Sequence, residues 1–238
     1  MEIQSMPGLK NIPLRWFALF AGFTILAMAI IAPFAELYAY PKLVVPGNGA
    51  ETSKNIVANK SLFISVLFSY LFTFIGDVLL SWALYFLLKQ VNRYLSLLAA
   101  CFRLVFAMIA LNALVNLITV FRLLNTSEYV TIFEPDQLNA QVMLCLNTFR
   151  SSYHFGILFF GIHLIITGYL VFKSDYIPKV LGLCLILSGL GYLADSLKPF
   201  LFPNFNTGFI TITFFGELIF MLWLLIKGSR LKESNQMS

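Results

Sequence analysis

Charged side chains are scarce in this chain of 238 residues. Asp, Glu, Lys and Arg make up 11% of the sequence, whereas soluble domains carry roughly 25%. Hydrophobic residues account for 59%, including 25 Phe and 10 Tyr. This balance excludes an ordinary soluble domain and predicts an integral membrane protein surrounded by membrane lipids.

Residues that commonly carry catalysis or bind metal are also few. The chain has two His and three Cys, and the cysteines (Cys101, Cys145 and Cys184) show no metal-ligand spacing. No GxSxG, HExxH or Gly-rich phosphate motif occurs, and no nucleic-acid-binding module is present. We therefore expect no metal, no cofactor and no nucleic-acid partner, and the sequence leans away from an enzyme without deciding the question.

Apolar runs of about 20 residues, the length needed to cross a bilayer, occur six times. They predict an all-α integral membrane bundle of six transmembrane helices, which forms one domain over residues 1–238. The stretch 137–148 is mildly amphipathic and could either extend the fourth helix or lie in the interface. The expected spans are about 14–34, 62–88, 94–121, 149–172, 178–197 and 209–226.

The distribution of basic residues predicts the orientation of the bundle, because cytoplasmic loops are enriched in Lys and Arg. With a cytoplasmic N-terminus, nine basic residues lie on that side, and both termini are cytoplasmic. Five lie on the other side: Lys42, Lys54, Lys60, Arg122 and Lys198. The nine are Lys10, Arg15, Lys89, Arg93, Lys173, Lys179, Lys227, Arg230 and Lys232.

Four ionisable side chains, each placed inside an apolar run, fall at a similar depth. A charged residue costs about 2.5–3.5 kcal/mol at a helix centre, so each one implies a partner, a wet cavity or a neutral state. Counting helical rise from the basic turns places the four roughly 15–18 Å into the bilayer. We expect them to form a ligand or proton site near the midplane: Asp77, Arg103, His163 and Glu217.

Three further ionisable residues, Arg150, His154 and Asp195, define an outer polar layer, in which Arg150 and Asp195 are the favoured pair. His154 and His163 are nine residues apart and point to opposite helix faces, which disfavours a shared zinc site.

Helical spacing also predicts packing faces. Glycines in the fourth and fifth predicted helices indicate a tight antiparallel hairpin. The stripe Asn112, Asn116 and Thr119 on the third helix is expected to face inward.

The segment 154–169, HFGILFFGIHLIITGY, is followed by PKVLG at 178–182 and GYLADS at 191–196. These residues resemble the bacterial membrane family called domain of unknown function 4386, and the similarity runs through nearly all six spans. Asp77 and Arg103 resemble polar positions of that family. The resemblance implies a six-helix, multi-pass protein of the bacterial cytoplasmic (inner) membrane, and it implies no activity.

Three functions fit these patterns. The leading one is binding of a small ligand, a proton or a lipid headgroup in a cavity lined by the four midplane residues. A small transporter is one form of it, although such a short chain favours a homo-oligomer for that role. The second is a lipid-modifying enzyme in which His163 acts with Asp77 or Glu217. The third is a non-catalytic scaffold or sensor subunit, whose buried charges only fix helix packing.

Overall fold

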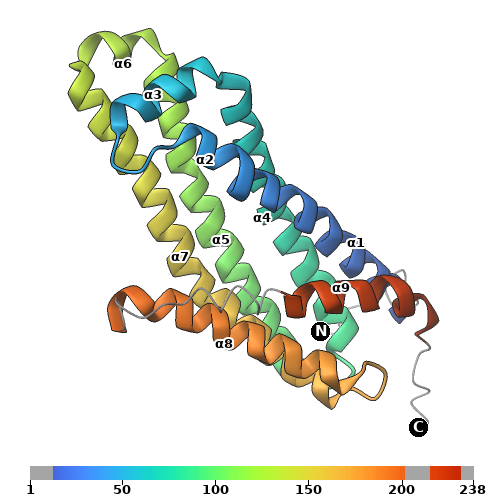
Figure 1. Ribbon diagram of the computed structural model, residues 1–238. Helices are drawn as coiled ribbons and strands as arrows, with labels where there is room; N and C mark the ends of the chain where they lie inside the picture. Colours follow the sequence, from blue (N-terminus) through green and yellow to red (C-terminus); the bar gives the residue numbers. More distant parts are fainter. Residues whose placement is uncertain (1–12, 202–214, 232–238) are drawn as a thin grey trace, which may run out of the picture.

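The computed structural model describes residues 13–201 and 215–231, and all regular structure in these ranges is helical (Figure 1). This confirms the predicted all-α class. The main helices are α1 (Leu14–Pro33), α4 (Lys60–Leu88), α5 (Arg93–Asn125), α7 (Pro135–Lys173), α8 (Lys179–Leu201) and α9 (Phe215–Lys227). The shorter elements are η1 (Phe34–Ala39), α2 (Tyr40–Leu43), α3 (Gly49–Ala58), α6 (Ser127–Ile132) and η3 (Gly228–Arg230).

Five helical segments among the described residues are long and apolar enough to cross a membrane. The chain is therefore a multi-pass helical membrane protein. The sixth expected span, 209–226, lies partly outside the described residues, and α9 covers its second part. The five segments are Leu14–Leu43, Lys60–Leu88, Arg93–Asn125, Pro135–Lys173 and Lys179–Lys198.

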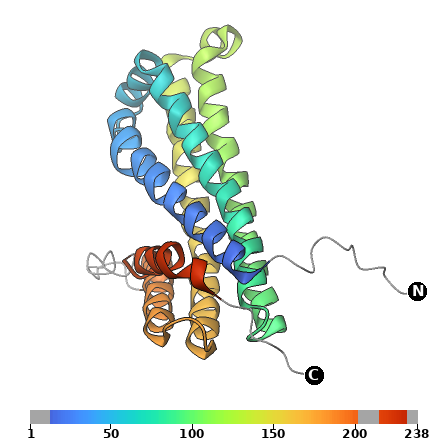
Figure 2. The ribbon, with the colours of Figure 1, turned by 90° about the vertical axis from the view of Figure 1, so that its right-hand side faces the viewer.

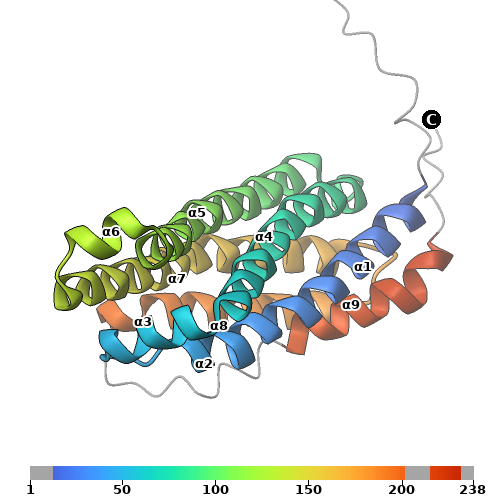
Figure 3. The same cartoon turned by 90° about the horizontal axis from the view of Figure 1, so that it is seen from above.

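The six main helices pack in a closed ring. Starting from α1, each helix contacts the next in the order α4, α5, α7, α8 and α9, and α9 returns to α1. Figure 2 shows α8 and α9 beside one end of the bundle, and in Figure 3 α9 lies alongside α1. The ring gives the protein an interior to which all six helices can contribute side chains.

The junction between α4 and α5 is short and well capped. Asn92 precedes α5, and its side-chain oxygen accepts a hydrogen bond from the backbone nitrogen of Leu95 at 2.9 Å. This satisfies one of the free N–H groups at the helix start. Two hydroxyls then join the helices, because Ser96 donates to the carbonyl of Tyr85 at 3.0 Å and Ser81 to that of Ala100 at 2.9 Å.

The stretch 137–148 extends the fourth predicted helix. Helix α7 begins at Pro135, where the missing N–H of proline costs nothing in a first turn. It runs without a break for 39 residues, which is about 58 Å at the rise of an α-helix. The helix is therefore far longer than the hydrocarbon layer, and its first turns reach beyond the predicted span.

The tight antiparallel hairpin of the fourth and fifth predicted helices is confirmed as the α7–α8 pair. A β-carbon on Gly168 would lie 2.7 Å from the carbonyl oxygen of Gly182, and one on Gly161 would lie 2.9 Å from that of Gly189. The reciprocal distances, from Gly182 and from Gly189, are both 2.6 Å. Only hydrogen fits between these backbones.

The inward orientation expected for the polar stripe on α5 is wrong. Asn112 and Thr119 are exposed, and Asn116 is half-buried. Thr119 donates a hydrogen bond to the carbonyl of Val115 at 2.9 Å, and Asn116 donates to that of Ala113 at 3.1 Å. Because short polar side chains can bond to their own helix backbone, they need no inward-facing partner.

Candidate functional site

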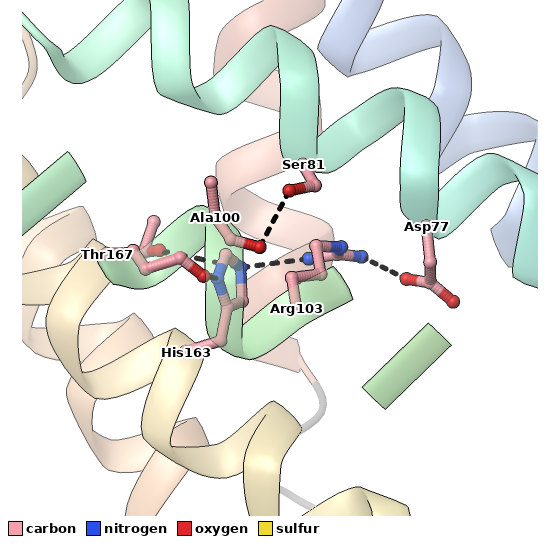
Figure 4. A network of polar contacts seen from close by, with 7 residues as sticks. Asp77, Ser81, Ala100, Arg103, His163 and Thr167 are labelled. Carbon is pink, nitrogen blue, oxygen red and sulfur yellow. Dashed lines mark hydrogen bonds and ion pairs between the residues drawn. The ribbon is translucent and has the colours of Figure 1, made fainter. Parts of the chain in front are cut away.

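Arg103 lies at the centre of a buried polar cluster contributed by three helices. Its Nη2 donates to Oδ1 of Asp77 on α4 at 2.6 Å, and its Nη1 lies 3.0 Å from Nε2 of His163 on α7. Figure 4 shows the guanidinium between these two side chains. All three residues are at most 2% exposed. The convergence expected for Asp77, Arg103 and His163 is therefore observed.

The hydrogen bonds of His163 identify its tautomer. Its Nδ1 lies 2.8 Å from the carbonyl oxygen of Ala99, which can only accept a hydrogen bond. Nδ1 therefore carries the proton, and Nε2 accepts from Arg103. Thr167 Oγ1 lies 3.4 Å from both ring nitrogens. The contacts fit a neutral imidazole whose two nitrogens are both engaged.

A cavity of about 310 Å³ lies at the centre of the helix ring. Every main helix and η1 contribute to its wall, which is mostly apolar. His163 is not among the described residues that line it, because it lies behind Arg103. The polar groups at the wall include Glu36, Asp77, Arg103, Tyr153, Tyr192 and Glu217.

Glu217, in the first turn of α9, lines the same cavity as Asp77 and Arg103. Tyr192 on α8 donates a hydrogen bond to its carboxylate. The other carboxylate oxygen, Oε1, is buried and has no hydrogen-bond partner among the described residues. Arg103 Nε is also buried without a partner. Among the described residues that line the cavity, one buried acceptor and one buried donor are thus without a partner.

Glu36 is a cavity residue that the sequence did not reveal. It lies in η1, a π-helical segment that continues α1 after Pro33. Tyr70 on α4 donates to its Oε1 at 2.8 Å, and Arg150 on α7 to its Oε2 at 2.9 Å. The first span was expected to end at about residue 34, which left Glu36 outside it, on the outer side of the membrane. Its continuation as FAELYAY to Tyr40 is the signal that could have identified it.

The outer polar residues differ from expectation in their partners. Arg150 forms its ion pair with Glu36, whereas the favoured partner was Asp195. His154 is exposed and makes an edge contact with Tyr153, with ring centroids 6.4 Å apart. Asp195 is half-buried near the end of α8. Among the described residues, no group of three or more His, Cys, Asp or Glu side chains could hold a metal ion.

Comparison with known proteins places the chain in a family without assigning an activity. An uncharacterized protein from Archaeoglobus fulgidus is 36% identical over 157 residues, covering 66% of this chain and 80% of that protein. The similarity therefore extends to an archaeon. No solved structure matches the chain. The model of the family described as "Domain of unknown function (DUF4386)" matches residues 20–228, and the chain therefore belongs to the DUF4386 family.

Proposed function

We propose that the protein binds a small molecule inside the membrane, in the cavity at the centre of its helix ring. The observation that carries this proposal is the cavity itself, about 310 Å³ with a mostly apolar wall and a few convergent polar groups. Small-molecule sites have this character, and this volume lies at the lower end of their usual range of roughly 300–1,000 Å³.

The buried cluster supports a division of roles within this site. Arg103 is held from both sides, by Asp77 and by His163, so it forms a rigid part of the wall. Both nitrogens of His163 are engaged and the ring is 1% exposed. A general base must reach the proton that it removes. His163 is therefore a positioning residue for Arg103, which weighs against an enzyme that uses it as a base.

The proposal includes a complete six-span topology in the cytoplasmic membrane of a bacterial or archaeal cell. It is supported by the position of η3, which packs against α1. A β-carbon on Gly228 would lie 2.9 Å from the β-carbon of Ala18. The start of α1 and the end of α9 thus share one end of the bundle. If residues 209–226 cross the membrane, both termini lie on the same side, and the excess of basic residues there assigns that side to the cytoplasm.

Three compounds with the same apolar body test the proposed function: 4-phenylbutylamine, 4-phenylbutan-1-ol and 4-phenylbutanoate. Each is titrated against the purified protein in detergent while the melting temperature is recorded. Binding to the folded state raises this temperature saturably. We expect at least one compound to do so.

The cavity-filling variant Ala32→Phe should abolish the effect, because Ala32 lines the cavity. Ala27→Phe is the matched control on the same helix, since Ala27 is exposed and is not among the lining residues. A melting temperature that no compound changes, or a shift that persists in Ala32→Phe, contradicts the proposal.

A further inference from the structure

We infer that the ligand of the central cavity is an organic cation with an apolar body, and that its positive group is held against Glu217. This inference deepens the proposed function and rests on it. It follows from the charges of the cavity wall, from the oxygen of Glu217 that has no partner among the described residues, and from the aromatic rings that line the same cavity.

The acids of the cavity outnumber the cations that contact them. Three acids line the cavity among the described residues, and of these Asp77 is paired with Arg103 and Glu36 is paired with Arg150. Neither pair includes Glu217, whose Oε1 is buried without a hydrogen-bond donor among the described residues. A buried carboxylate is unfavourable unless a proton or a cation compensates it. An ammonium group supplies both the charge and the missing donor.

The same excess of acid disfavours an anionic ligand. Both terminal nitrogens of Arg103 are already committed, Nη2 to Asp77 and Nη1 to His163. Arg103 keeps three further N–H groups, Nε–H among them, but its single positive charge is already balanced by Asp77, so it offers little net attraction to a second carboxylate or a phosphate. A carboxylate placed in the cavity would also meet the unpaired Glu217.

Aromatic rings in the wall complement a cation. Phe74, Phe106, Tyr153, Phe160 and Tyr192 all line the cavity. Ring faces attract cations that lie within about 6 Å of the centroid. The wall already contains one such contact, because Cζ of Arg103 lies 5.0 Å from the centre of the Phe160 ring. The aliphatic side chains of α1 leave an apolar surface for the rest of the ligand.

The affinities of the three phenylbutyl compounds, measured by equilibrium dialysis on the full-length protein, test the inference. They share a body and differ in the charge of the terminal group. We expect the amine to bind about 10- to 100-fold more tightly than the alcohol, the usual gain from a charge-assisted hydrogen bond. The carboxylate should bind most weakly.

Glu217→Gln, which keeps the shape of the side chain, should remove the preference for the amine over the alcohol. Glu128→Gln is the matched control, because Glu128 is exposed on α6 and the charge change is identical. Glu217→Asp, which keeps the charge, should retain part of the preference. The comparison of the three compounds on the unmodified protein needs no variant, so the inference stays testable if Glu217→Gln does not fold.

The outcomes separate the two proposals. If the three compounds bind equally, or the carboxylate binds best, and Ala32→Phe still abolishes binding, the cation inference fails while the proposed function stands. If Glu217→Gln keeps the full preference for the amine, Glu217 is not the counter-charge and the inference fails. If none of the compounds binds, both proposals fail.

Discussion

Arg103 has almost no contact with solvent and depends on its partners for compensation. Its ion pair with Asp77 is only 2–3% exposed at the side chains, whereas the Arg150–Glu36 pair is 44% and 26% exposed. Removing one member of a buried pair leaves the other charge uncompensated, whereas water compensates the members of an exposed pair. The two pairs should therefore respond differently to substitution.

We expect Arg103→Met to lower the free energy of unfolding by about 3–5 kcal/mol, because Asp77 would remain buried without a cation. The double variant Arg103→Met/Asp77→Asn should recover at least about 1 kcal/mol of this loss. Denaturant titration in detergent measures both quantities, with the exposed Arg122→Met as the control on the same helix. A double variant no more stable than Arg103→Met would show that the pair provides no compensation.

Arg150→Gln should change the free energy of unfolding by at most about 1 kcal/mol, since its ion pair is partly solvated. The same titration measures the effect, and Tyr70 still donates to Glu36 in this variant. A loss comparable with that expected for Arg103→Met would mean that the outer pair is as strongly desolvated as the inner one.

The inner cluster around Arg103 and the outer Arg150–Glu36 pair also differ in how well the sequence predicted them. Asp77, Arg103 and His163 could be placed together because regular helices carry each of them a known number of residues from a turn. Glu36 could not, because the π-helix after Pro33 changes the direction of the side chains relative to an α-helical count. Whether Glu217 and Arg103 bind a ligand stays a prediction.

The α7–α8 pair depends on the absence of side chains at four positions. Gly168→Ala should lower the free energy of unfolding by about 1–3 kcal/mol, because the new methyl group would overlap the backbone of α8. Gly76→Ala on α4 is the control, since its methyl group would meet the flexible side chain of Met28. Thermal unfolding should separate the two variants, and equal melting temperatures would contradict the close backbone contact.

The spacing of the glycines explains why the close packing of α7 and α8 could be predicted, whereas the orientation of the polar residues on α5 could not. Gly161 and Gly168 are seven residues apart, as are Gly182 and Gly189, so each pair lies on one helix face. Small residues on facing helices have few uses other than close approach. A polar stripe is ambiguous, because Asn and Thr can be satisfied either by a neighbouring helix or by their own backbone, as Asn116 and Thr119 are.

The arrangement of the helices shows which loops share an end of the bundle (Figure 1). The distribution of basic residues then predicts which end faces the cytoplasm. Two single-cysteine variants in a cysteine-free background test this topology. Lys54→Cys places an exposed thiol on α3, and Asp175→Cys places one between α7 and α8, at the opposite end of the bundle (Figure 1). We expect a membrane-impermeant maleimide, added to intact cells, to label Lys54→Cys and not Asp175→Cys. Labelling after lysis is the control for reactivity, and the reverse pattern would invert the proposed orientation.

The order of the helices along the chain has a consequence for biosynthesis. Asp77 and Arg103 lie on consecutive helices, which are joined by the short turn between Leu88 and Arg93. The carboxylate and the guanidinium can therefore meet as soon as this helical hairpin has left the ribosome. Their charges can cancel while the two segments are still passing through the insertion machinery. Neither helix then has to enter lipid with a bare charge, and His163 reaches the pair only after α7 has been translated.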